Sequence, residues 1–289
     1  MPLRIMVSRH SAFYSPLIAT IAGDFLREQG LDATYDVLRP GQRSQVLIRD
    51  GVVDIVQSAV SSNWRLIESG ETPRPVHFAQ INRRDGFFLA GRRADPEFAW
   101  KKLEGATLLA DHGLQPLVML KYAVHHNGAD WQKLRVVDAG SPEQMDAAFR
   151  AGEGDYVHLQ APASHQIAKD GAGAVVASVG RSMPQVAFSS LCASAEFLQT
   201  DRARAFVEAF GRARRWVQEA PPAEIAATEA AFFPGVDADV LSAAIEAYQR
   251  LGCWEGGLDI PKDLCEQALN VFEQAGEIRA RHPYSAISS

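Results

Sequence analysis

The stretch Gly41–Ser58, GQRSQVLIRDGVVDIVQS, contains one full unit of the pattern that decides the fold. A polar loop leads into residues 45–49, which predict a short helix, and residues 52–56 predict a strand rich in valine. The same alternation extends outward from this stretch, with predicted strands at 3–7, 31–37 and 76–81 and predicted helices at 15–29 and 61–67. Strands that alternate with short helices favour parallel sheets, whose ligand-binding loops gather at the carboxyl ends of the strands.

A second run of strands and helices begins near Gly91. Its predicted helices are 95–103, 116–126, a segment that starts at Ser141, and 162–170, and its predicted strands are 106–110, 134–138, 155–160 and 174–179. After a strand near 188–193 the pattern becomes helical, with helices expected at 197–220, 223–232, 238–251 and 261–275. We therefore expect two α/β lobes and a helical tail that packs on the first lobe.

The composition excludes several classes of protein. The chain has 289 residues, a formal net charge of −6, 47% hydrophobic and 22% charged residues, as in a water-soluble globular protein. An acidic balance argues against a nucleic-acid binder, and the lack of a long apolar run argues against a membrane span. The N-terminus does not read as a secretory leader, so we expect either a cytoplasmic chain or a periplasmic one whose leader was removed.

Familiar enzyme signatures do not occur in the sequence. It contains no GxxxxGK[ST], GxSxG, HExxH or CxxC motif, and Cys192, Cys253 and Cys265 are too scattered for a disulfide framework. The histidines His125 and His126 are adjacent on a predicted helix and point in different directions, unlike the spaced pairs of metal sites. We therefore predict no metal and no cofactor.

Polar loops at the ends of predicted strands supply the candidate site. The first loop, Ser8–Ser15, offers the cation Arg9, the imidazole of His10 and the aromatic Tyr14 next to a helix N-terminus, where anions are favoured. Arg43 lies in a second such loop. The alternative for the first loop is a solvated connection whose aromatic residues pack on the core, and the alternative for Arg43 is an ordinary surface arginine.

A third loop, residues 57–64, carries small hydroxyl side chains that would allow a ligand to approach the backbone. Ser58 and Ser61 are its candidate ligand contacts, and Trp64 could stack on a ligand. A tryptophan at such a position is more often a core residue.

Two loops of the second lobe complete the set. His112 and Gln115 flank a glycine turn at a helix N-terminus, and His158 and Gln160 alternate along one strand, so both reach the same face. Together with the loops of the first lobe, they predict a cleft between two lobes, which is where small-molecule sites commonly form.

Four stretches resemble the type II periplasmic substrate-binding proteins, in the branch that binds nitrate, taurine and alkanesulfonates and that includes thiamine-pyrimidine synthases. They are residues 3–25, Gly41–Val60, the Lys102–Ala106 stretch KLEGA, and 190–216, which begins SLCASAEFL. The resemblance implies a first lobe at 1–88 and 189–289, a second lobe at 89–188, and hinge motion near 89–91 and 184–188.

The resemblance implies a protein that closes on a small anionic ligand of the sulfonate, carboxylate or pyrimidine class, with an ABC permease as partner. Arg9 and Arg43 would supply positive charge. A rival interpretation is a cytoplasmic enzyme on the same scaffold, a decarboxylase, a lyase or an enzyme of pyrimidine biosynthesis, that uses His10, His112 or His158 as a general acid or base. The pyrimidine synthase's cysteine-rich run is missing, and the loop after the first strand carries Ser11 where a desulfinase would need cysteine. A ligand-sensing module is a third alternative.

Overall fold

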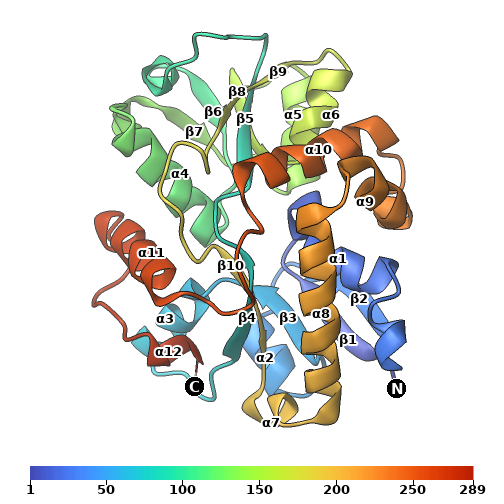
Figure 1. Cartoon of the computed structure of the whole chain (residues 1–289). Coiled ribbons are helices and arrows are strands. Elements are labelled where there is room, and N and C mark those ends of the chain that lie inside the picture. Colours follow the sequence, from blue (N-terminus) through green and yellow to red (C-terminus); the bar gives the residue numbers. More distant parts are fainter. Residues whose placement is uncertain (289) are drawn as a thin grey trace.

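The computed structural model describes residues 1–288 and shows two lobes, each built on one sheet (Figure 1). The first sheet has the strand order β2-β1-β3-β10-β4. Its strands are β1 (Leu3–Val7), β2 (Ala33–Val37), β3 (Ile55–Ser58), β4 (Val76–Asn82) and β10 (Ser189–Ala193). β1 runs parallel to β2 and β3, whereas β10 runs antiparallel to β3 and β4. The sheet is therefore mixed, because its last strand returns from the second lobe.

The second sheet has the order β7-β6-β8-β5-β9. Its strands are β5 (Phe87–Gly91), β6 (Thr107–Leu109), β7 (Arg135–Val137), β8 (Tyr156–Gln160) and β9 (Ala174–Ser178). β5 is buried along its whole length and pairs antiparallel with β8 and β9. The structure confirms the two-lobed α/β architecture that the alternating pattern predicted.

Helices cover both sheets. Those between strands are α1 (Ser15–Ala22), α2 (Ser44–Arg49), α3 (Ser61–Glu68), α4 (Leu114–His126), α5 (Pro142–Arg150) and α6 (Ala163–Lys169). The tail contains α7 (Ala195–Leu198), α8 (Asp201–Glu219), α9 (Pro222–Glu229), α10 (Ala238–Leu251), α11 (Lys262–Gln274) and α12 (Ser285–Ser288). Short 3₁₀ turns occur at Ala12–Tyr14, Arg27–Gln29, Trp100–Leu103, Trp131–Lys133 and Ala230–Phe232. Within residues 1–288, no helix combines the length and the apolar character needed to cross a bilayer.

Three local predictions were wrong. Helix α1 ends at Ala22, because Gly23 caps it and Asp24 takes a positive φ of 62°. The helix expected at 95–103 is only a 3₁₀ turn at its end. Residues 87–91 form β5, which we did not predict because a strand buried on both faces shows no alternation of polar and apolar residues.

Two chain segments cross between the sheets, Arg83–Gly86 and 179–188, and they lie side by side. The amide of Val186 donates to the carbonyl of Arg83 at 3.0 Å, and Gly180 lies so close to the backbone of Asp85 that a Cβ there would be 2.1 Å from the Asp85 carbonyl oxygen. Of the two segments in which we expect hinge motion, 89–91 lies inside β5, whereas 184–188 lies in a crossing. The predicted lobe boundary at residue 88 also falls within this strand.

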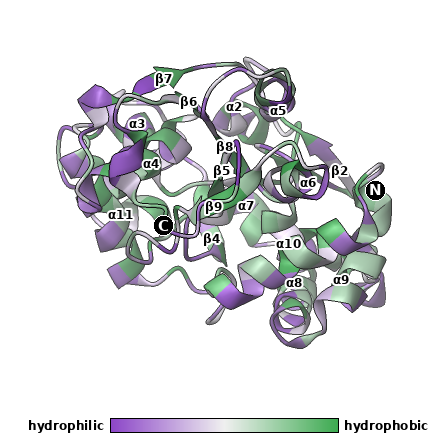
Figure 2. Cartoon of the chain, turned by 90° about the horizontal axis from the view of Figure 1, so that it is seen from above, coloured by the Kyte–Doolittle hydropathy of each residue, from purple (hydrophilic) through white to green (hydrophobic). Residues whose placement is uncertain are grey.

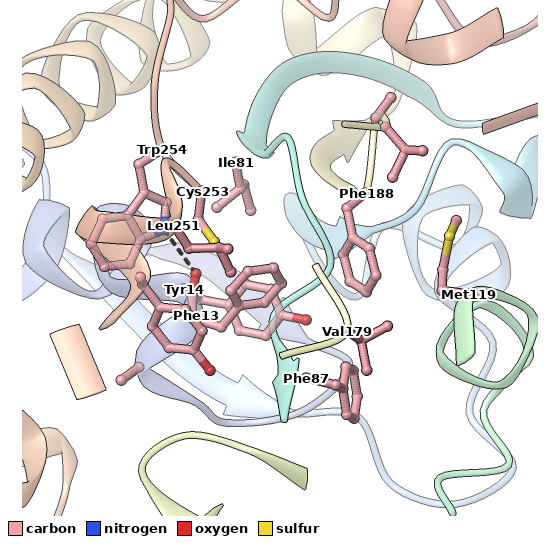
Figure 3. Packing of buried hydrophobic residues seen from close by; sticks show 14 of the residues in the cluster. Phe13, Tyr14, Ile81, Phe87, Met119, Val179, Phe188, Leu251, Cys253 and Trp254 are labelled. Carbon is pink, nitrogen blue, oxygen red and sulfur yellow. Dashed lines mark hydrogen bonds between the residues drawn. The ribbon is translucent and has the colours of Figure 1, made fainter. Parts of the chain in front are cut away.

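The helical tail packs on the first lobe, as expected, and reaches the second lobe as well. α8 and α9 lie against α1, while α10 contacts α6 and α11 contacts α4 (Figure 1). The tail helices carry both hydrophobic and hydrophilic residues (Figure 2), as helices with one buried face do. Trp254 enters the core next to Phe13, where its indole N–H donates to the Phe13 carbonyl at 3.1 Å (Figure 3). The tail therefore fixes the loop that follows β1.

Candidate functional site

A cavity of about 540 Å³ lies between the two sheets, where the loops after β1, β3, β6 and β8 converge. We call it the polar chamber, because hydroxyl and amide side chains from both lobes line it: Ser8, Gln57, Ser58, Ser61, Ser62, Gln115, Gln160 and Ser189. Most of these side chains lie at or after the carboxyl ends of strands, where ligand-binding loops gather, while Ser189 begins the antiparallel strand β10.

A second cavity of about 420 Å³ adjoins the first, and we call it the apolar chamber. Its wall contains the apolar residues Pro142, Leu159, Pro162, Phe232, Phe233 and Val236, and the charged residues Glu143, Asp146 and Arg150 also line it. The side chains of Arg9, Phe87 and Gln160 line both chambers and therefore separate them. Phe87 packs with one face near the Arg9 guanidinium, at 5.3 Å, and stacks on His158 with ring centroids 4.3 Å apart.

An ion pair crosses the cleft between the chambers. The guanidinium of Arg9, from the loop after β1, donates to both carboxylate oxygens of Asp111, from the loop after β6, and the Nη2–Oδ1 distance is 3.2 Å. The side chains are 19% and 6% exposed. Burial alone would raise the pKa of the Asp111 carboxyl, but the Arg9 charge holds it below its usual value. Removing one partner of such a buried pair typically costs about 3–5 kcal/mol.

The Asp111 carboxylate is also fixed by its own loop. The amide of Gly113 donates to Asp111 Oδ1 at 2.8 Å, and a Cβ at Gly113 would be 2.8 Å from that oxygen and 3.2 Å from Arg9 Nη2. A larger residue at position 113 would therefore displace one or both side chains of the ion pair. A second contact joins the lobes, since Ser61 Oγ donates to Gln115 Oε1 at 2.8 Å.

Strand β8 places two buried polar side chains close to the cleft. Gln160 is 7% exposed and lines both chambers, and its amide interacts with the Tyr14 hydroxyl. His158 is fully buried behind Phe87, and neither ring nitrogen has a partner within the described chain. Burial lowers the pKa of His158 to about 3, so the ring is uncharged at neutral pH.

Comparison with known proteins identifies this architecture. No family model matches the chain. It is similar to "Putative binding protein YtlA" of Bacillus subtilis (strain 168), with 26% identity over 282 residues, 96% of this chain and 84% of that protein. Its structure superimposes on the ligand-binding component of an ABC-type import system from Staphylococcus aureus with a TM-score of 0.77 and 13% identity, covering 100% of this chain and 96% of that one.

The aliphatic sulphonate binding protein SsuA from Escherichia coli gives a TM-score of 0.75 at 12% identity, over 99% of this chain and 97% of that one. The nitrate-binding protein NrtA from Synechocystis PCC 6803 gives 0.67 at 12% identity, over 99% and 83%. The fold is that of the type II periplasmic binding proteins. The resemblance inferred from the sequence is confirmed at the level of the fold.

Within this periplasmic-binding fold, most of the predicted site residues come together. The polar chamber is lined by Arg9, Tyr14, Arg43, Ser58, Ser61, Gln115 and Gln160. His10 lies on the other side of Arg9 and lines the apolar chamber, where its ring nitrogens contact the Tyr35 hydroxyl at 3.0 Å and the Phe232 carbonyl at 2.7 Å. Residues at the ends of β1, β2, β3, β6 and β8, or in the loops that follow these strands, thus contribute to one cleft, as the strand-end argument predicted.

Three predicted residues lie elsewhere. Trp64 is 2% exposed and packs edge-on against Phe272 of α11 at 5.2 Å, so it is a core residue rather than a stacking surface for a ligand. His112 lies outside both chambers, with Nδ1 2.8 Å from the Ala110 carbonyl. His158 lies behind Phe87 and lines neither chamber. The helix α3 turns Ser61 toward the cleft and Trp64 toward the tail.

The sequence reasoning missed two residues at the centre of the site. Phe87 separates the chambers, but it belongs to the strand that was not predicted. Asp111 was within a loop that we considered, and its position directly after a strand could have marked it as a candidate. Its contact with Arg9 lies 102 residues away in sequence, which no local pattern reveals.

Proposed function

We propose that this chain is a substrate-binding protein that closes its two lobes on a small organic ligand in the polar chamber. The observation that carries the proposal is the polar chamber, a cavity of about 540 Å³ that side chains of both lobes line and that the buried Gln160 amide faces. A ligand held there would contact both lobes at once and would therefore favour their closed arrangement. The lobes would close by bending the two crossing segments.

We further propose that the chain works with an ABC-type permease and that it acts outside the cytoplasmic membrane after removal of a leader. The similarity to import-system binding proteins over nearly the whole chain supports this assignment. The tail helices contact both lobes, so a change in the lobe angle alters the outer surface that a permease would contact.

A thermal-shift panel tests the proposal. It comprises alkanesulfonates, nitrate, aromatic carboxylates and thiamine-pyrimidine compounds. A ligand present at 100 times its dissociation constant stabilises the folded state by about 2.7 kcal/mol, which raises the Tm of a chain of this size by several degrees. Native mass spectrometry of the freshly purified protein would show a bound small molecule directly.

A matched pair of variants locates the binding. Ser62→Trp would fill the polar chamber, whereas Val207→Trp would place the same ring in a separate surface hollow beside α8. We expect the stabilisation to be lost in the first variant and kept in the second. A compound that stabilises Ser62→Trp as strongly as the wild type would show that ligand binds elsewhere, and the proposal would be wrong.

A further inference from the structure

The positive charges of the polar chamber are already neutralised by carboxylates of this chain. We expected an anionic ligand because of the arginines, yet each arginine that lines the chamber contacts an acidic side chain. The pairs are Arg9 with Asp111, Arg43 with Glu71 at 2.6 Å, and Arg65 with Glu277 at 3.8 Å. The last two pairs are exposed and weak, but the Arg9 pair is buried at the centre of the site.

An incoming anion would meet the Arg9 pair at a disadvantage. It would have to take the place of the Asp111 carboxylate, which would then remain buried, unpaired and beside a second negative charge. Asp111 cannot retreat easily, because Gly113 N–H and the close backbone hold it.

The polar groups around the chamber other than the arginines are uncharged, and several already bond within the chain: Gln57 accepts from Ser8, and Ser61 donates to Gln115. The Gln160 amide, which lines both chambers, offers N–H donors beside a carbonyl acceptor. An amide recognises a partner that offers an acceptor beside a donor, because both hydrogen bonds then form together. A ligand that carries only acceptors would bond the amide N–H groups but would offer no donor to the Gln160 carbonyl oxygen.

We propose that the ligand of the polar chamber is an uncharged molecule that carries a hydrogen-bond donor next to an acceptor, such as a carboxamide or a sulfonamide. The Gln160 amide hydrogen-bonds to this donor and acceptor. Asp111 neutralises the Arg9 charge and so disfavours binding of the corresponding carboxylates and sulfonates. The inference rests on the proposed function, since it names the ligand class of the same chamber.

Isosteric pairs of compounds test the proposal by calorimetric titration at pH 7. Suitable probes are nicotinamide against nicotinate, benzamide against benzoate, and methanesulfonamide against methanesulfonate. We expect the wild type to bind the neutral member of at least one pair at least tenfold more tightly than the acid. Gln160→Met, which keeps the size but removes the amide, should weaken that neutral ligand at least tenfold. Acids that bind the wild type as tightly as their neutral partners would overturn the proposal.

Asp111→Asn provides the decisive comparison, because it frees Arg9 without changing the shape of the site. We expect the variant to gain at least tenfold in affinity for the acids. Glu266→Gln, at an exposed pair with Arg281 that lines neither chamber, should change that affinity less than threefold. Gly113→Ala is an independent second variant, since its Cβ would press on the same carboxylate and loosen the pair. If neither variant gains affinity for any acid, Asp111 does not exclude anions and the proposal is wrong.

The two proposals fail in different ways. If the chain is not a substrate-binding protein of this kind, no neutral or acidic probe and no co-purified molecule binds the wild-type chamber, while Asp111→Asn still acquires affinity for acids. If the ligand class is wrong, the wild type does bind a small molecule in the chamber, and that molecule is an anion. Circular dichroism of each variant confirms that it is folded before it is titrated.

Discussion

Ser61 Oγ donates to Gln115 Oε1 at 2.8 Å and so joins the first helical turn of α3 in one lobe to that of α4 in the other. The Gln115 amide in turn donates to the Phe188 carbonyl in the second crossing. This chain of hydrogen bonds links the two lobes to the segment that must bend when they separate. The contact therefore favours the arrangement in which the two lobes lie close together.

Loss of this contact should open the empty protein. A typical hydrogen bond contributes about 0.5–1.5 kcal/mol, so Ser61→Ala should shift the ratio of closed to open molecules about 2- to 10-fold toward open. Small-angle X-ray scattering would show a larger radius of gyration than for wild type. Thr228→Ala on the exposed face of α9 serves as the control. A scattering profile identical to that of the wild type would mean that the bond does not hold the lobes together.

Asp85 should make the protein less stable as the pH rises. The carboxyl is fully buried in the first crossing, and burial raises its pKa to about 8, although its Oδ1 accepts a hydrogen bond from the Phe87 amide at 2.7 Å. The unfolded chain ionises near pH 4 and the folded chain only near pH 8, so stability from this group declines between those values.

The variant Asp85→Asn keeps the acceptor for Phe87 and cannot ionise. Relative to the wild type, we expect it to gain at least about 1 kcal/mol between pH 4.5 and pH 8 in urea unfolding. The exposed Asp201→Asn should show no such gain. If the free energy of unfolding changes with pH in the same way for the wild type and for Asp85→Asn, the assignment of a raised pKa to this carboxyl is wrong.

Trp64 should matter for stability and not for ligand binding. Truncation of a buried aromatic residue typically costs about 3–5 kcal/mol, and Trp64→Ala removes the ring that packs on Phe272. We expect a large fall in Tm, together with a dissociation constant within threefold of the wild-type value when binding is measured well below that Tm. Trp64→Phe should restore much of the stability. A tenfold loss of affinity in Trp64→Phe would show that Trp64 contributes to ligand binding.

His158 should remain uncharged through the neutral range. Burial lowers its pKa to about 3, and it stacks on Phe87 with no contact to either chamber. The ring resonances of His158, assigned by their disappearance in His158→Gln, should therefore not shift between pH 5 and pH 8 in NMR spectra. A midpoint near pH 6.5 would favour the interpretation in which His158 acts as a general acid or base.

The sequence was informative where function depends on strand ends. Arg9 and Gln160 each follow or end a predicted strand, and both reach the cleft. The sequence pattern could not show that the tail covers one face of α3. Trp64, which lies on that face, was therefore a candidate for the site as well as for the core. The central strand β5 escaped because its five residues are all buried and carry no periodic signal.

Long-range pairing was beyond the reach of the sequence. The Arg9–Asp111 pair joins two loops 102 residues apart, and the contact of Trp254 with Phe13 joins residues 241 apart. The charge of the site depends on the first of these contacts. From the sequence, Arg9 counts as a free positive charge that would attract an anionic ligand. In the folded molecule Asp111 neutralises this charge, and the ligand class that we propose is therefore uncharged.

The pairing of the two crossing segments limits how the molecule can move. Arg83 and Val186 are hydrogen-bonded, and the Gly180 backbone rests on that of Asp85, so neither strand of the connection can bend alone. We therefore expect the lobes to rotate about a single axis along the two paired crossings, with little twisting. Loops far from the crossings would move farthest in such a rotation.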